Sequence, residues 1–306
     1  MRGKNAALFF SYEYLGGRNG SLQSPAFLFT LKRKTMFGQN RGGGFRLSPT
    51  ILIALAMAAF TLFKYCSSSV TNDVTGETQH ISLTTDEEIA MGLQSAPQMA
   101  AEMGGEVQGT QADAKVKAVG QKLVQMSDAS KTVYNGKFDF HLLADDQTVN
   151  AFALPGGQVF ITVALLQRLK NEDQLAGVLG HEIGHVVARH SAEKIAQMEL
   201  AQGLTGAVTM ATYDPGSPNG GYLAQMVANT LQLKYGRDQE LQSDDLGVRF
   251  MIQADYDPEQ LIEVMEILKQ ASGPRDTPEF QSTHPDPENR KQRIQEAIAK
   301  YRGQGN

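Results

Sequence analysis

The sequence offers almost nothing for covalent cross-linking. It contains one cysteine, Cys66, and no tryptophan among its 306 residues, and only 8% of its residues are aromatic. A single cysteine excludes an internal disulfide and a metal site built from cysteines. The hydrophobic share of 41%, in a chain of this length, is enough for one sizeable domain with additional segments.

Acidic residues are nearly missing from the first segment. Residues 1–46 contain eight Lys and Arg residues and one Glu, whereas residues 47–306 contain 20 Lys and Arg and 32 Asp and Glu. The acidic part gives no sign of a nucleic-acid surface, so we expect no nucleic-acid partner. We expect residues 1–46 to form a basic arm without regular structure, in which Met36 is a second candidate start. An arm rich in Arg and poor in acids is also similar to a mitochondrial transit peptide.

Charge is absent from residues 47–63, a run of 17 residues at the short end of the range for a membrane span. The basic residues before it, of which Arg41 and Arg46 are nearest, predict that the N-terminus lies in the cytoplasm and the rest of the chain outside. We therefore expect a membrane anchor at residues 47–65 and a polar tether at residues 66–84.

A cleaved secretory signal is the alternative to an anchor, because the apolar run is only slightly long for one. Lys64, Tyr65 and Cys66 follow the run and do not offer the small residues that signal cleavage needs. An uncleaved anchor is therefore favoured, and a secreted or periplasmic protein would result from cleavage.

The strongest chemical signal is an H-E-x-x-H motif at residues 181–185. Apolar residues recur around it at helical spacing, so we predict a helix. On a helix, His181 and His185 lie one above the other, about 6 Å apart along the axis, and can bind one cation. Neutral imidazole suits zinc, and two histidines need a third protein ligand to leave one position open. Glu182 lies between them, where its carboxylate can take a proton from water.

A second predicted helix, over residues 222–253, carries two carboxylates that complement this motif. Glu240 and Asp244 are four residues apart and therefore share one helical face. This spacing suits Glu240 as a carboxylate ligand and Asp244 as the acceptor of the outer ring N–H of a ligating histidine. Asp238 and Asp245 are interpreted as solvated surface residues.

The remaining pattern predicts a mainly helical chain with a few strands. The other predicted helices cover residues 85–103, 113–126, 163–169, 258–271 and 287–301, and the motif helix is expected to continue to about residue 210. The predicted strands cover residues 138–144, 150–152 and 159–162. Residues 212–221 are expected to form a connecting loop or a lid. His80, His141 and His190 are interpreted as structural or surface residues.

Four sequence blocks together resemble the membrane-associated zinc metallopeptidases of the M48 family, the group of the Ste24 and HtpX proteases. They are residues 150–157, residues 181–185, the run from Arg237 through Glu240 to Asp244, and Thr283-His284-Pro285 with Arg290. Gly236 stands where the family usually has serine and Ser243 where it has alanine, and neither is a ligand position. The chain is most similar to the short, single-anchor members of the bacterial envelope.

The resemblance implies an α+β fold over residues 85–302. It consists of a mainly helical zincin-type core with a small antiparallel sheet over the motif helix. One Zn²⁺ ion per chain is expected on His181, His185 and Glu240, with Glu182 as the catalytic base. Asp244 and Arg237 are expected around these ligands.

The resemblance also assigns roles to two further blocks. His284 is expected near the metal, either as a donor to the oxyanion of the transition state or as a fourth zinc ligand. Asn150, Ala151 and Phe152 are expected on an edge strand that binds an extended peptide substrate.

The predicted function is therefore a zinc-dependent endopeptidase acting on unfolded or misassembled envelope proteins. The alternative is an envelope chaperone or assembly factor on the same scaffold, in which proteolysis is rare and gated. The predicted location is the inner membrane, with the catalytic domain on the periplasmic side. A periplasmic or secreted protein after signal cleavage, and a protein of the mitochondrial inner membrane, are the alternatives.

Overall fold

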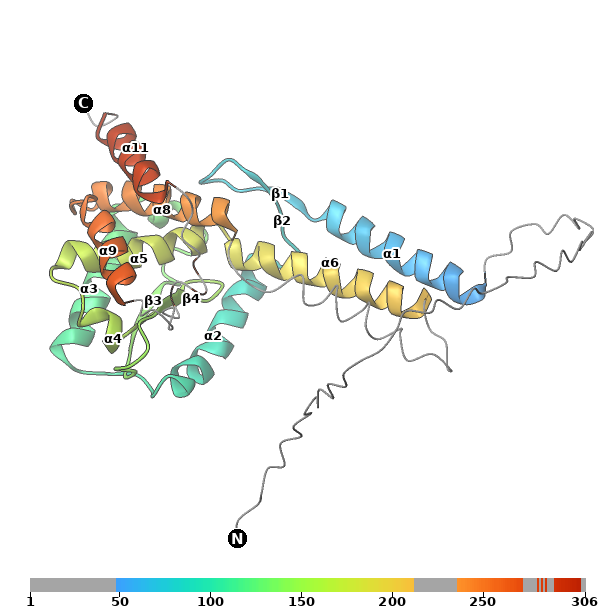
Figure 1. Cartoon of the computed structure of the whole chain (residues 1–306), viewed down its shortest axis with the longest axis horizontal. Coiled ribbons are helices and arrows are strands. Elements are labelled where there is room, and N and C mark those ends of the chain that lie inside the picture. Colours follow the sequence, from blue (N-terminus) through green and yellow to red (C-terminus); the bar gives the residue numbers. More distant parts are fainter. Residues whose placement is uncertain are drawn as a thin grey trace, which may run out of the picture. The chain divides into compact units, whose positions relative to one another are not determined.

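The structure is a computed structural model that describes residues 48–211, 236–271, 280, 282, 284 and 289–303. All of them belong to one compact unit, Leu47–Asn306 (Figure 1). The helices are α1 (Pro49–Ser67), α2 (Thr85–Glu102), α3 (Gln111–Met126), α4 (Val163–Leu166), α5 (Glu172–Val187), α6 (His190–Ala211), α8 (Arg237–Gln253), α9 (Gln260–Ala271) and α11 (Arg290–Gly303). The predicted arm, the loop at 212–221 and the first part of the predicted helix at 222–253 lie outside the described residues.

The strands form two small sheets. They are β1 (Ser69–Thr71), β2 (Thr78–His80), β3 (Asp139–Leu143), β4 (Ala151–Ala153) and β5 (Gln158–Thr162). The first two form a hairpin, and the other three form a sheet in the order β3-β5-β4. The mainly helical character with small sheets is therefore confirmed.

The predicted antiparallel pairing is wrong for β3. β4 pairs antiparallel with β5, but β3 pairs parallel with it. The reason is the tight turn between β4 and β5, where Gly156 and Gly157 adopt φ values of 80° and 112°, conformations that favour glycine. The chain reverses direction twice, between β3 and β4 and again between β4 and β5, so β5 runs in the same direction as β3. β5 then lies between the other two strands and pairs with both.

The predicted continuous helix through the motif and on to residue 210 is also wrong. α5 ends at Val187, and α6 begins at His190. Between them Arg189 has a φ of 59°, which is uncommon for a residue other than glycine. The guanidinium of Arg189 holds this break by donating to the buried Glu88 carboxylate, with Nε at 3.0 Å from Oε1, and the Tyr134 hydroxyl donates to the same carboxylate at 2.7 Å.

The segment predicted as a tether contains the β1–β2 hairpin. Its buried side chains satisfy carbonyl groups that the end of α5 would otherwise leave without partners. Nδ2 of Asn72 donates to the Val187 carbonyl at 2.9 Å, and Nε2 of Gln79 donates to the Ala188 carbonyl at 2.7 Å. The polar composition of this segment therefore reflects contacts with the motif helix.

α5 is buried along nearly its whole length, from Gln174 to Val187. Two glycines let it approach α8 closely. A Cβ atom at Gly184 would lie 2.9 Å from the Ser243 carbonyl oxygen, and one at Gly247 would lie 3.1 Å from the His181 nitrogen. The first distance is too short for a real side chain, and the second would require a shift of the backbone of α5. This close approach of α5 and α8 therefore depends on glycine at Gly184 and is favoured by glycine at Gly247.

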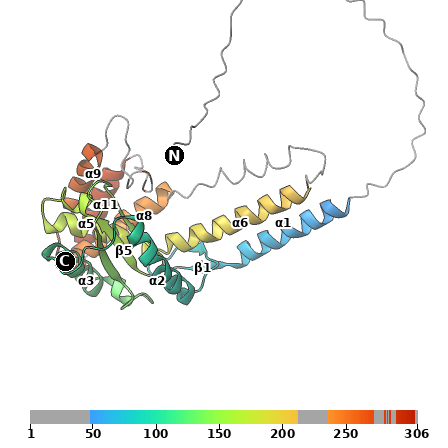
Figure 2. The same cartoon turned by 90° about the horizontal axis from the view of Figure 1, so that it is seen from below.

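α1 lies beside α6, and both views show the two helices running along each other (Figures 1 and 2). An ion pair of 2.7 Å joins Nζ of Lys64 to the Glu199 carboxylate. Within the described residues, α1 is the one helix long and apolar enough to cross a membrane.

Candidate active site

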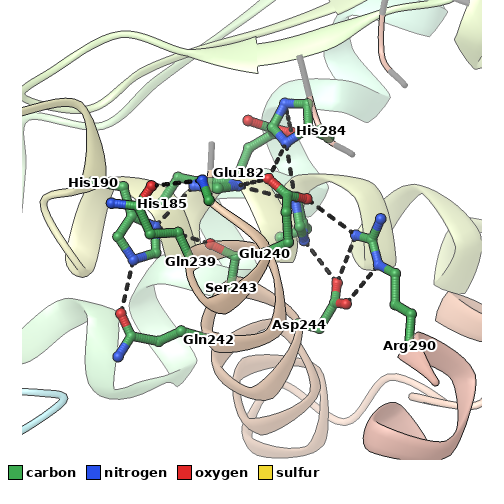
Figure 3. Close-up of polar contacts among 12 residues, drawn as sticks. Glu182, His185, His190, Gln239, Glu240, Gln242, Ser243, Asp244, His284 and Arg290 are labelled. Carbon is green, nitrogen blue, oxygen red and sulfur yellow. Dashed lines mark hydrogen bonds and ion pairs between the residues drawn. The ribbon is translucent and has the colours of Figure 1, made fainter. Parts of the chain in front are cut away.

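Three segments bring four side chains with metal-binding atoms to one buried point (Figure 3). His181 and His185 come from α5, Glu240 comes from α8, and His284 lies in the segment before α11. One ligand atom from each lies within 4.8 Å of all the others, and no side chain is more than 1% exposed. The four residues predicted to surround the metal therefore converge.

The donor set fits zinc. Nε2 of His181 lies 3.0 Å from Nε2 of His185, and each of these nitrogens is 3.4 Å from an oxygen of Glu240. Two imidazole nitrogens and a carboxylate oxygen are a usual protein ligand set of catalytic zinc. Oε2 of Glu240 lies 3.4 Å from Nε2 of His181 and 3.5 Å from a terminal nitrogen of Arg290, but among the described residues it accepts no hydrogen bond of good geometry, so it remains available to a cation.

The electrostatics of the cluster also favour a cation. Burial raises the pKa of Glu240, but hydrogen bonds with the histidines reverse this and leave it well below its usual range. Burial lowers the pKa of His181, yet the Asp244 and Glu240 carboxylates raise it to about 9. The two acidic groups therefore stabilise a positive charge among the ligands, which a proton or a metal ion can supply.

Asp244 is the partner of His181. Its Oδ1 accepts a hydrogen bond from Nδ1 of His181 at 2.8 Å, which directs Nε2 toward the cluster. Arg290 in turn donates from Nε to Oδ2 of Asp244 at 2.6 Å and from a terminal nitrogen to Oδ1 at 2.9 Å (Figure 3). Arg237, by contrast, is exposed at the first residue of α8, and the arginine that contacts Asp244 is Arg290.

His190 is the partner of His185, and the sequence analysis missed it. Its Nδ1 lies 2.9 Å from Nδ1 of His185, and its Nε2 lies 2.7 Å from Oε1 of Gln242. Burial lowers the pKa of His190 to about 4, so its ring is neutral near pH 7. Gln242 accepts from Nε2–H, which leaves Nδ1 of His190 to accept the N–H of His185.

Glu182 lies beside the four clustered side chains. Its side chain is fully buried, and neither carboxylate oxygen has a hydrogen-bond partner among the described residues. Nε2 of His284 is 3.7 Å from Oε1. Burial raises the pKa of Glu182, which suits a carboxylate that accepts a proton and gives it back.

His284, in the segment before α11, directs its ring toward His181 and Glu240. Its Nδ1 lies 3.0 Å from Oε1 of Glu240 and 3.3 Å from Nε2 of His181. The Phe280 ring stacks on its imidazole, with ring centroids 4.5 Å apart. This stacking, together with burial, fixes the orientation of the His284 ring toward the other three side chains.

The model of peptidase family M48 matches residues 110–298, more than half of the chain. The chain belongs to peptidase family M48. Its site contains the H-E-x-x-H motif and the downstream glutamate in the geometry described above.

Individual proteins match over similar lengths of the chain. The chain is 38% identical to the mitochondrial metalloendopeptidase OMA1 of Schizosaccharomyces pombe over 164 residues, which cover 52% of this chain and 46% of that protein. It is 33% identical to the beta-barrel assembly-enhancing protease of Escherichia coli K12 over 182 residues, covering 57% and 36% of the two chains. It is 31% identical to the mitochondrial metalloendopeptidase OMA1 of Bos taurus over 202 residues, covering 62% and 38%. The match thus spans less than half of each of these relatives.

The predicted substrate strand of this M48 chain lies at an edge of its sheet. β4 is the outer strand next to β5. Thr162 donates to the Asn150 carbonyl at 3.0 Å, and Leu154 donates to the Gln158 carbonyl at 2.8 Å. Because hydrogen-bonded residues alternate along an antiparallel pair, the backbone groups of Ala151 and Ala153 face away from β5. Phe152 stacks on Phe160, with centroids 4.8 Å apart.

Proposed function

We propose that this chain is a zinc-dependent endopeptidase that cleaves unfolded or misassembled proteins at a membrane. The convergence of His181, His185 and Glu240 beside the Glu182 carboxylate, which accepts no hydrogen bond from the described residues, carries this proposal. Membership of family M48 supports it, and so do the endopeptidase and protease names of the relatives.

Different residues of the site would bind the metal, transfer the proton and orient the ligands. His181, His185 and Glu240 would hold one zinc ion, which supplies a Lewis acid that polarises a peptide carbonyl and acidifies water. Glu182 accepts the proton that the attacking water loses and returns it to the leaving amine. Asp244 and His190 fix the tautomers of the two ligand histidines, so that their Nε2 atoms face the metal.

His284 has two proposed roles. Its Nδ1 lies within the ligand set, 3.0 Å from Oε1 of Glu240, which supports a fourth ligand that holds the enzyme inactive until its segment moves. A donor from the same ring to the oxyanion of the transition state would instead accelerate the reaction. The sign of the effect of removing His284 distinguishes the two roles.

The edge of β4 supports an extended peptide as the substrate. Ala151 and Ala153 are buried in this structure. Once the contacts that cover them open, their outward backbone groups can pair with a segment of any sequence, as in other strand-addition sites. Such recognition requires an unfolded segment, because a folded protein seldom presents an unpaired strand.

The proposed location is a membrane to which α1 anchors the domain. α1 has the length and composition of a span, and its charge-free run follows a basic segment. The relatives are named as mitochondrial or as enhancing beta-barrel assembly, which supports the bacterial envelope or the mitochondrial inner membrane. Loss of α1 as a cleaved signal is the competing outcome.

The test uses the full-length protein, purified in detergent. Metal content is measured, and casein cleavage is followed with chelator, after zinc is restored, and in Glu182→Gln. Zinc-dependent cleavage that Glu182→Gln lacks supports the proposal. A zinc-loaded protein that prevents aggregation of unfolded clients without cleaving them would support the chaperone or assembly alternative instead.

A further inference from the structure

α6 follows α1 in a constant antiparallel register. Lys64 pairs with Glu199 at 2.7 Å. One turn further along, a Cβ atom at Gly203 would lie 2.4 Å from the Thr61 side chain, and one at Gly206 would lie 3.5 Å from Cε of Met57. Each step toward the start of α1 is therefore a step toward the end of α6.

On one side of the Lys64–Glu199 pair, toward the start of α1 and the end of α6, neither helix contains a charged residue. On α1, no charged residue precedes Lys64 within residues 47–63. On α6, residues 190–199 include Glu193, Lys194 and Glu199, whereas residues 200–211 include no charge. The ion pair thus marks one level at which both helices change from charged to uncharged.

In their uncharged parts, α1 and α6 pack against each other as helices do in membranes. Gly203 brings the backbone of α6 against Thr61, and small residues at such contacts are typical of helices that pack in lipid. Two hydroxyl groups are satisfied within their own helices, since Thr61 donates to the Met57 carbonyl and Thr209 to the Thr205 carbonyl, each at 2.9 Å. The buried Thr205 hydroxyl has no hydrogen-bond partner among the described residues. Large apolar side chains of α1 remain exposed, namely Leu52, Ile53, Leu55, Phe60, Leu62 and Phe63.

We propose that residues 200–211 of α6 lie in the same lipid bilayer as α1, so that two helices embed this protease in the membrane. The inference rests on the proposed α1 anchor. Twelve helical residues extend about 18 Å, just past the middle of a hydrocarbon core of about 30 Å. Lys64 and Tyr65 then lie at the bilayer surface, where amphipathic side chains of this kind are enriched.

This arrangement also sets the height of the active site. α6 begins at His190, whose ring contacts the ligand His185. The nine residue steps from His190 to Glu199 correspond to roughly 14 Å along the helix axis. The metal ligands are therefore held close to the bilayer surface.

The test measures depth at single cysteines in the full-length chain, in a Cys66→Ser background that removes the one native thiol. Thr209→Cys reports the uncharged half of α6, and Gln197→Cys is its control in the charged half, since both positions are exposed. Leu55→Cys on α1 is the control at nearly the same depth as Thr209. Each cysteine carries an environment-sensitive fluorophore, in vesicles of phosphatidylcholine and phosphatidylglycerol with nitroxide-labelled acyl chains.

We expect quenching at Thr209 to match that at Leu55 and to exceed that at Gln197 by at least about twofold. Quenching at Leu55 alone, with Thr209 behaving like Gln197, would overturn the inference and leave the α1 anchor intact. If neither Leu55 nor Thr209 is quenched, the anchor itself fails and the inference fails with it. Casein cleavage by the same variants reports separately on the proposed protease activity.

A second measurement tests the helix contact itself. A Cβ atom at Gly203 would lie 3.0 Å from Cβ of Thr61, near the separation of about 3.8 Å in disulfides. We expect Thr61→Cys with Gly203→Cys to cross-link in vesicles under mild oxidation, and Thr61→Cys with Gln197→Cys to remain reduced. Absence of the first cross-link would contradict the packing on which the inference depends.

Discussion

Nδ1 of His190 lies 2.9 Å from Nδ1 of His185, as Oδ1 of Asp244 lies 2.8 Å from Nδ1 of His181. Each ligand histidine therefore has its own buried partner, one neutral and one charged. The difference matters for the metal, because a carboxylate partner makes an imidazole more basic than a neutral partner does.

Removing the neutral partner should weaken zinc binding. We expect His190→Ala to lower zinc affinity by about 10- to 100-fold, the usual effect of losing such a partner, because the His185 ring loses its fixed tautomer. Competition with a chromogenic chelator measures this. His80→Ala is the control, since His80 hydrogen-bonds to the Tyr65 carbonyl outside the site. Equal affinities in the two variants would contradict the role of His190.

Glu182 should be needed for catalysis and dispensable for the metal. We expect Glu182→Gln to bind zinc normally and to lose at least about 100-fold in kcat, because only the proton acceptor is removed. Glu240→Ala should lose the zinc as well as the activity. The measurement is metal content together with peptide hydrolysis, and wild-type turnover in Glu182→Gln would reject the assignment.

Local sequence signals predicted much of this site. The motif helix begins with a local cap, since the side chain of Asn171 accepts from the Gln174 nitrogen at 2.8 Å. Helical spacing alone placed His181 with His185 and Glu240 with Asp244. These features depend on residues within one turn of each other, which a sequence displays directly.

The errors concern relationships between distant residues. On a continuous helix His190 would lie about 140° around the axis from His185, so only the break at Arg189 brings them together. That break is held by Glu88, which is distant in sequence. Arg290 reaches Asp244 from another helix, and no spacing rule distinguishes it from Arg237. The parallel pairing of β3 likewise depends on which edge of β5 remains available.

The outward edge of β4 should control substrate affinity. We expect Ala151→Pro to raise KM severalfold or abolish cleavage, because proline removes an N–H that faces away from β5. Ala151 is fully buried, so the variant must also show unchanged zinc content and thermal unfolding. Ala153→Pro removes the next outward N–H and serves as the second variant. Unchanged kinetics in both folded variants would reject strand addition.

An acidic residue away from the site should contribute stability that depends on pH. Asp128 is buried at the end of α3, where burial raises its pKa but Gln253, Lys131 and Arg249 lower it to about 2. A carboxylate whose pKa is lowered by folding stabilises the protein above the unfolded pKa of about 3.9, and this contribution is lost as pH falls toward 2. We expect Asp128→Asn to lower the free energy of unfolding by about 1 kcal/mol at pH 7. Urea unfolding at pH 7 and pH 2.5 should show the difference shrinking, and a constant difference would contradict it.

The effect of removing His284 has a predicted sign for each of its roles. As a fourth ligand, its imidazole occupies the position that the substrate needs, so His284→Ala should raise kcat/KM while zinc affinity falls. As an oxyanion donor, its loss should lower kcat by tenfold or more and leave zinc affinity unchanged. The 3.0 Å approach of Nδ1 to Oε1 of Glu240 favours the ligand role, because both atoms then face the same cation. His141→Ala is the matched control, since this buried histidine pairs with Gln158 and Glu106 away from the ligands. If His284→Ala and His141→Ala have the same activity and zinc affinity, His284 has neither role and its burial serves packing on Phe280 alone.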